Sequence, residues 1–185
     1  MKGNLKLLLL VALASALGMV AGFLVSQKVG EKQQSAGEQQ IINESVDFTL
    51  PDTTDKQQSF SQWRGKLVLL NFWAPWCNPC RKETPLLIKA QNSYAGQGLQ
   101  IIGLAVDEKQ HVVQFMQDFG INYPVLLGVD EGIDLMEKLG NNMGALPFSA
   151  FIDPQGKVIS SKLGEFTADE LDNTLKKLLS ASNPR

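Results

Sequence analysis

The sequence predicts an α/β fold in which helices flank a mixed central β-sheet, with an N-terminal transmembrane helix ahead of the folded domain. Three observations lead to this prediction. The chain starts with a long uncharged apolar stretch, its later part alternates short apolar runs with amphipathic segments, and Cys77 and Cys80 stand where one such run meets an amphipathic segment. The length of 185 residues suits one folded domain of ordinary size.

The uncharged stretch covers residues 7–25 and follows Lys2 and Lys6. A helix of this length can cross a bilayer core of about 30 Å. The alternative is a cleaved signal peptide in which Ala14–Ala16 imitates the cleavage site, but the apolar core of a signal peptide is normally shorter. We therefore expect residues 1–26 to form an uncleaved membrane anchor.

The positive charges before the span favour a cytoplasmic N-terminus. The rest of the chain would then lie in the periplasm, on the far side of a bacterial inner membrane, where disulfide bonds can form. Residues 27–45 are mostly polar and lack aromatic side chains, which predicts a flexible linker. The folded domain is expected over residues 46–181.

The folded domain opens with predicted strands. Short ones are expected at Asp47–Leu50 and Gln58–Phe60. The run Lys66–Trp73 is apolar and too short for a helix, so it predicts a buried strand. Strands buried on both faces are typical of the centre of a sheet covered by helices.

A parallel strand–helix–strand unit is predicted next. Cys77–Tyr94 has a helical pattern, in which Pro85 is expected to cause a kink. Leu99–Val106 is a second apolar run and a second buried strand. Lys109–Phe119 carries apolar residues at helical spacing and predicts an amphipathic helix.

The chain ends in a predicted antiparallel hairpin covered by a helix. Thr167 should cap that last helix, with Glu170 completing a capping box. A turn containing proline and glycine joins the two hairpin strands. In order, the elements expected before the last helix are a short strand at Tyr123–Leu127, a helix at Asp130–Leu139, and hairpin strands at Phe148–Ile152 and Lys157–Lys162.

Composition excludes several classes of protein. A formal net charge of −2 lacks the basic excess of a nucleic-acid-binding protein, and a hydrophobic content of 44% separates the chain from disordered proteins. Two cysteines are too few for a disulfide scaffold. With a single histidine they are also too few for a four-ligand zinc site, unless carboxylates complete it. We expect no metal and no cofactor.

Cys77 and Cys80 form a C-x-x-C motif at the predicted start of a helix, beside a strand–helix–strand pattern. Unpaired N–H groups and the helix dipole favour a thiolate at Cys77, which makes it the expected nucleophile. Cys80 is close to the same helix face and can reach it, so the pair should cycle between dithiol and disulfide. The alternatives are weaker, because a disulfide over so short a loop stabilises little and a zinc ribbon needs a second pair.

The segment Phe72–Cys80 resembles the thioredoxin active-site motif, and the resemblance runs from about Val46 to Leu179. Together with the anchor, the segments Cys77–Pro85, Gly144–Pro147 and Phe151–Lys157 are similar to the TlpA/ResA-like membrane-anchored thiol–disulfide oxidoreductases. The resemblance implies a thioredoxin fold and an enzyme that reduces selected protein disulfides, including those of apocytochrome c or copper-site assembly proteins. A membrane electron donor would re-reduce it.

The resemblance also implies residues that bind the substrate. Pro147 matches a cis-proline that faces the C-x-x-C motif, and the backbone of Leu146 before it would pair with a bound substrate peptide. Trp76 is expected to line the substrate surface, with Trp73 packed beneath it.

Glu83 matches a glutamate near the active site of the family. A partly buried carboxylate at this position can accept the proton of Cys80 when the mixed disulfide is resolved. Asn71 stands where thioredoxin has a buried aspartate, and because asparagine cannot titrate, acid–base assistance has to come from another residue. The alternative role for Glu83 is a surface ion pair with Lys82 or Lys89.

The leading hypothesis is a disulfide reductase, and Asn78 supports it because strongly oxidising relatives carry a histidine in this region. A peroxide-reducing enzyme is one alternative, but Ala74 and Leu70 stand where its template requires a hydroxyl residue and a proline. A Cu(I)-binding assembly module is another, although such modules usually add a histidine and His111 is not obviously placed to serve. A pure interaction module is the last alternative.

Overall fold

The computed structural model describes residues 45–182. The predicted membrane anchor, residues 1–26, and nearly all of the predicted linker, residues 27–45, lie outside this part of the chain. Within residues 45–182, no helix combines the length and the apolar character needed to cross a bilayer.

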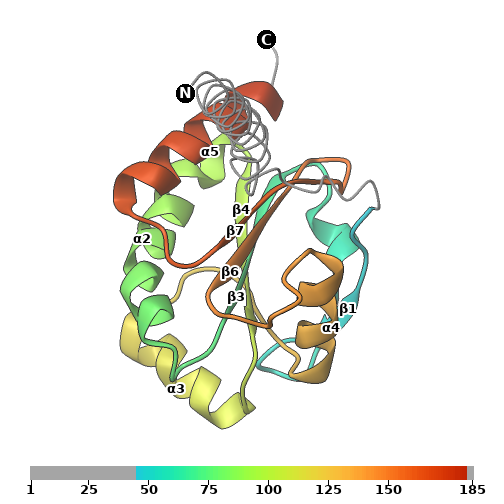
Figure 1. Ribbon diagram of the computed structural model, residues 1–185, viewed down its shortest axis with the longest axis vertical. Coiled ribbons are helices and arrows are strands. Elements are labelled where there is room, and N and C mark those ends of the chain that lie inside the picture. Colours follow the sequence, from blue (N-terminus) through green and yellow to red (C-terminus); the bar gives the residue numbers. More distant parts are fainter. Residues whose placement is uncertain (1–44, 183–185) are drawn as a thin grey trace, which may run out of the picture. The chain divides into compact units, whose positions relative to one another are not determined.

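A five-stranded mixed sheet in the order β5-β4-β3-β6-β7 forms the centre of the domain (Figure 1). The central strand β3 pairs with β4 in parallel and with β6 in antiparallel orientation. All of its residues are buried, as expected for a strand covered on both faces. The strands are β3 (Leu67–Trp73), β4 (Leu99–Ala105), β5 (Val125–Leu127), β6 (Phe148–Ile152) and β7 (Val158–Leu163).

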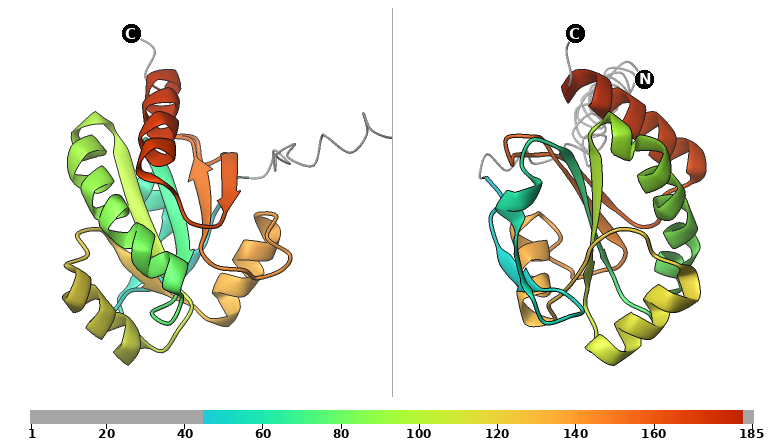
Figure 2. Two further views of the ribbon diagram at one scale, coloured as in Figure 1. Left: turned by 60° about the vertical axis from the view of Figure 1, so that its left-hand side comes forward. Right: turned by 180° about the vertical axis from the view of Figure 1, so that it is seen from behind.

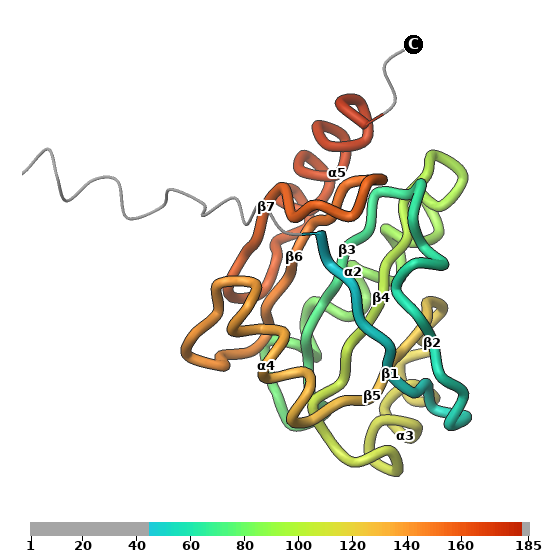
Figure 3. Tube along the Cα trace, turned by 90° about the vertical axis from the view of Figure 1, so that its right-hand side faces the viewer, coloured from blue at the N-terminus to red at the C-terminus, as the bar shows by residue number. Residues whose placement is uncertain are grey.

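Helices cover both faces of this sheet (Figures 1 and 2). The helices on one face are α2 (Asn78–Tyr94), α3 (Lys109–Phe119) and α5 (Ala168–Ser182). The other face carries α4 (Asp130–Lys138) and the short elements β1 (Thr49–Pro51), β2 (Gln57–Ser59) and η1 (Phe60–Trp63). A further short helix, η2 (Ala95–Gln97), follows α2. Figure 3 shows the β1–β2 hairpin running across the sheet on the side of α4.

The alternation of side chains along β3 builds two hydrophobic cores. Leu69 and Trp73 belong to the core under α2, α3 and α5, whereas Leu70 and Phe72 belong to the core under α4 and the β1–β2 hairpin. β3 is therefore packed on both faces of the sheet up to its last residue, Trp73. The loop that carries the cysteines begins directly after it.

The structure confirms the predicted sheet with helices on both faces, and most elements fall within a few residues of their expected positions. The capping box is present: the Thr167 N–H donates to Glu170 Oε2 at 2.9 Å and the Glu170 N–H donates to Thr167 Oγ1 at 3.3 Å. β5 is shorter than predicted and begins after Pro124, which has no N–H to donate to a ladder. α2 continues through Pro85 as one helix.

Candidate active site

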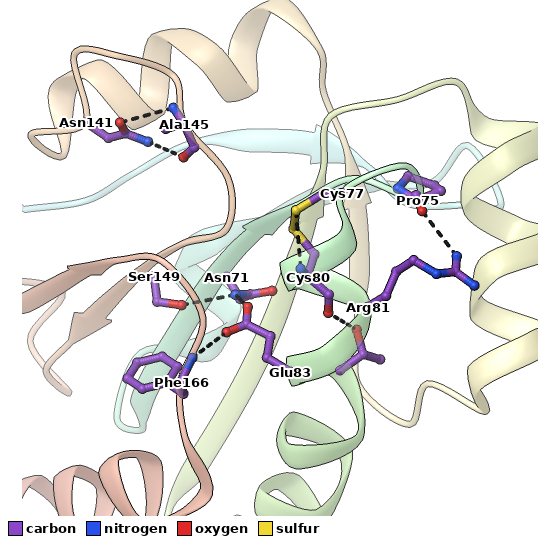
Figure 4. Close-up of a disulfide and its surroundings, with 11 residues drawn as sticks. Asn71, Pro75, Cys77, Cys80, Arg81, Glu83, Asn141, Ala145, Ser149 and Phe166 are labelled. Atoms are coloured by element: carbon purple, nitrogen blue, oxygen red, sulfur yellow. Dashed lines mark hydrogen bonds between the residues drawn. A yellow bond between two sulfur atoms is a disulfide. The ribbon is translucent and has the colours of Figure 1, made fainter.

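The two cysteines form a disulfide at the N-terminus of α2 (Figure 4). Cys77 is the N-cap residue, with extended backbone angles, and its sulfur accepts the backbone N–H of Cys80 at 3.3 Å. Pro79 lies in the first turn, where its missing N–H costs no helix hydrogen bond. Cys77 is 5% exposed and Cys80 0% exposed, so Cys77 is the sulfur nearer to solvent.

The position of Cys77 determines what the pair can do. The free N–H groups of the first helical turn stabilise negative charge on the Cys77 sulfur after reduction. Cys80 is fully buried directly behind it and can react only with what is already attached to Cys77. This difference in burial is the one expected if Cys77 attacks a substrate disulfide and Cys80 resolves the mixed disulfide.

A buried polar network lies beneath the disulfide (Figure 4). Sheet register places Asn71 of β3 opposite Ser149 of β6, and the Asn71 amide donates to Ser149 Oγ at 3.0 Å and to Glu83 Oε1 at 2.8 Å. The second carboxylate oxygen of Glu83 accepts the backbone N–H of Phe166 at 3.1 Å. Glu83, Asn71 and Ser149 are all buried, so this network fixes the carboxyl group within the core.

Burial is the main reason that the pKa of Glu83 rises, from 4.5 to about 7. The hydrogen bonds from Asn71 and from the Phe166 N–H favour the charged form and partly oppose this rise, as does the charge of Lys162, whereas Glu165 adds to it. A carboxyl group that titrates near neutral pH can both take up and release a proton. Lys82 pairs instead with Glu165 at 3.9 Å, so the alternative of a surface ion pair between Glu83 and Lys82 is not what the structure contains.

In the loop before β6, the Leu146–Pro147 peptide bond is cis, as the family resemblance implied. The carbonyl of Pro147 accepts the N–H of Gly164 at 2.8 Å, which ties this loop to the segment following β7. Pro147 is buried and Leu146 is half-buried. The cis-proline therefore lies within a braced part of the domain.

Comparison with known proteins agrees with this geometry. A model of the AhpC/TSA family matches residues 41–161. The thiol-disulfide oxidoreductase ResA of Bacillus anthracis is 34% identical over 176 residues, which cover 94% of this chain and 94% of that protein. The chain belongs to the AhpC/TSA family and is a ResA-like thiol–disulfide oxidoreductase. ResA of Bacillus subtilis (strain 168) is 31% identical over 169 residues, covering 90% of each chain.

Solved structures show the same fold as this ResA-like oxidoreductase. A thiol:disulfide interchange protein of the thioredoxin family from Chlorobium tepidum TLS superposes with a TM-score of 0.67 and 29% identity, covering 73% of this chain and 94% of that one. A thiol:disulfide interchange protein from Bacteroides sp. gives a TM-score of 0.65 at 25% identity, covering 81% and 93%. The thioredoxin-like fold is thereby established for the described domain.

The surface beside the disulfide of the ResA-like domain includes an exposed aromatic side chain. Trp76 is 68% exposed, whereas Trp73 is buried, and its ring lies tilted against that of Phe115 with the ring centroids 4.6 Å apart. Arg81 braces this loop, since its guanidinium donates to the Pro75 carbonyl at 3.2 Å and lies over the Phe115 ring. An open groove adjoins the loop, lined by Pro75, Trp76, Arg81, Asp107, His111, Gln114, Phe115 and Asp118.

His111 lies at the rim of this groove rather than in the catalytic network. Its Nδ1 is 2.9 Å from Asp107 Oδ1, and this hydrogen bond raises the pKa of the imidazole. Within residues 45–182, no three His, Cys, Asp or Glu side chains are grouped closely enough to hold a metal ion.

Three polar groups that hold the candidate site of this ResA-like domain were not predicted from the sequence. Ser149 and the Phe166 N–H hold the Asn71–Glu83 pair, and Asn141 holds the loop before the cis-proline. Asn71 alone gave a signal, as a polar residue inside an apolar strand. The partners come from distant parts of the chain and carry no local motif.

Proposed function

We propose that this oxidoreductase acts as a reductant of disulfides in other proteins, on the periplasmic side of a bacterial inner membrane to which residues 7–25 anchor it. One observation carries the proposal: a solvent-side sulfur at a helix N-terminus is backed by a buried sulfur and by a buried carboxyl group whose pKa is near 7. A reductase needs a stabilised attacking thiolate, a resolving thiol and a proton acceptor for that thiol.

The proposed reaction starts from the dithiol enzyme. The Cys77 thiolate attacks one sulfur of the substrate disulfide, a Cys77–substrate disulfide forms, and the other substrate sulfur leaves as a thiolate that takes up a proton. Glu83, one helical turn beyond Cys80, accepts the Cys80 proton, and the Cys80 thiolate attacks the Cys77 sulfur. The second substrate sulfur leaves and is protonated. Two electrons pass to the substrate, which becomes a dithiol, and the enzyme becomes the disulfide.

The substrate is proposed to bind in an extended form alongside Leu146, with Trp76 covering the residues around its disulfide. In residues 45–182, neither the N–H nor the C=O of Leu146 has a hydrogen-bond partner, and Trp76 is largely exposed. Free backbone groups of this kind pair with an added strand. The TlpA/ResA resemblance extends the proposal to apocytochrome c or a copper-site protein as substrate and to a membrane protein as electron donor.

The reduction potential of the Cys77–Cys80 couple tests the direction of electron flow. We expect equilibration of the full-length chain with dithiothreitol buffers to give a potential near that of thioredoxin, about −270 mV. The oxidised and reduced fractions are measured by alkylation and mass spectrometry. A potential near that of the strong oxidant DsbA, about −120 mV, would overturn the assignment as a reductant.

A further inference from the structure

The chain enters the loop before the cis-proline through a tightly defined helix end. α4 terminates in a Schellman motif, in which Gly140 has a positive φ of 94° and its N–H donates to the Glu137 carbonyl at 2.9 Å. The Asn141 N–H donates to the Met136 carbonyl, also at 2.9 Å. This geometry turns the Asn141 side chain inward, where it is 4% exposed.

The Asn141 amide uses both of its polar groups on one residue of the loop (Figure 4). Its Nδ2 donates to the Ala145 carbonyl at 2.9 Å, and its Oδ1 accepts the Ala145 N–H at 3.3 Å. An amide is a side chain that offers a donor and an acceptor side by side, as a strand backbone does. The Asn141 side chain thus pairs with the N–H and C=O of Ala145 as a neighbouring strand would.

Leu146 lies between two residues that are tied down. Ala145 before it is held by Asn141, and the Pro147 carbonyl after it accepts the Gly164 N–H. The Leu146 side chain packs against both hydrophobic cores. Within the described residues, the Leu146 N–H and C=O have no hydrogen-bond partner, whereas the backbone groups of its two neighbours are paired. The backbone of Leu146 is therefore held in place and free to pair with another chain.

We propose that Asn141 is a positioning residue for substrate binding, whose amide holds Ala145 so that Leu146 presents its N–H and C=O to an extended peptide next to the substrate disulfide. The proposal rests on the proposed function in one respect, the pairing of the substrate with Leu146. A preformed edge lowers the conformational entropy lost on binding, so the amide contributes to affinity without touching the substrate. Small disulfides that bring no peptide backbone gain nothing from it.

The test compares two disulfides that the same thiolate attacks. In the full-length chain with Cys80→Ala, reduced Cys77 is reacted with a short extended peptide carrying one disulfide and, separately, with cystamine, and the mixed disulfides are timed by mass spectrometry. Adding Asn141→Ala should lower the ratio of the peptide rate constant to the cystamine rate constant about tenfold, as expected for the loss of one or two hydrogen bonds. Asn142→Ala, a change at the exposed neighbouring asparagine, should leave the ratio unchanged.

Asn141→Asp is a second variant for the case in which Asn141→Ala does not fold. It keeps the shape of the side chain and the acceptor for the Ala145 N–H, but it loses the donor to the Ala145 carbonyl. It should lower the same ratio. A purely structural role would slow both reactions together, and an unchanged ratio in both Asn141 variants would overturn the assignment. A failure of substrate pairing itself would look different, since the chain with Asn141 intact would already show no preference for the peptide, and this result would overturn both proposals.

Discussion

Replacing Cys80 with alanine is expected to abolish turnover and to accumulate a covalent complex between Cys77 and the substrate protein. The attacking sulfur is untouched, so the mixed disulfide forms at a nearly normal rate. The resolving thiol, buried directly behind Cys77, is absent, and no other cysteine of the chain can replace it because the sequence has only two. Non-reducing gel electrophoresis and mass spectrometry of the full-length variant expressed in cells would display the complexes.

The matched control is Cys77→Ser, which should form no mixed disulfide and show no turnover. If the single variant Cys77→Ser, in which Cys80 is intact, still formed mixed disulfides with substrate proteins, the buried Cys80 would be the attacking cysteine. The identity of the trapped proteins tests the proposal that the substrate is apocytochrome c or a copper-site protein. Trapped cytochromes with paired cysteines or trapped copper-site proteins support it, and trapped proteins from neither class would contradict it.

Replacing Glu83 with glutamine should slow the resolution step about a hundredfold or more, the range of general acid–base contributions. Glutamine keeps the size of the side chain but cannot accept the Cys80 proton. In the native enzyme the rate of resolution should fall as the pH drops below about 7, because protonated Glu83 no longer accepts a proton. Glu83→Gln should lose this titration, which stopped-flow decay of a preformed mixed disulfide would measure. A native pH profile in the variant would contradict the assignment of Glu83.

The same substitution has a consequence for stability, with a sign set by the raised pKa. Between pH 4.5 and about 7 the unfolded chain has lost the Glu83 proton while the folded domain keeps it, so rising pH favours unfolding in this window. Relative to Glu83→Gln, the free energy of unfolding of the native protein should fall by up to about 3 kcal/mol across the window and level off above it. Urea denaturation at several pH values measures the difference, and parallel pH curves for the two proteins would contradict a buried Glu83 carboxyl.

The sequence predicted the elements well where local patterns determine them. The capping box of Thr167 and Glu170, the buried run of β3 and the helix that follows the cysteines are all properties of contiguous residues. η1 was not predicted, because a 3₁₀ turn at Phe60–Trp63 leaves no periodic pattern. The length of β5 depends on its partner β4 and on Pro124, so its local apolar pattern suggested too long a strand.

The site shows where prediction from sequence stops. The C-x-x-C spacing indicated Cys77 and Cys80 as the candidate redox pair, and the family resemblance indicated Pro147. The depth to which Glu83 is buried depends on the loop after β7, whose Phe166 N–H binds it, and on Ser149 across the sheet, which holds Asn71. These contacts join segments far apart in the chain, and no periodicity or spacing indicates them.

The order in which the two thiols react shows which sulfur is the nucleophile. The reduced full-length chain is treated with limiting iodoacetamide over a range of pH, and the alkylated cysteines are assigned by peptide mass spectrometry. We expect Cys77, at the N-terminus of α2 and nearer to solvent, to be alkylated first, with Cys80 protected until the domain unfolds. Alkylation of Cys80 before Cys77, or of both at equal rates, would contradict the assignment of Cys77 as the nucleophile.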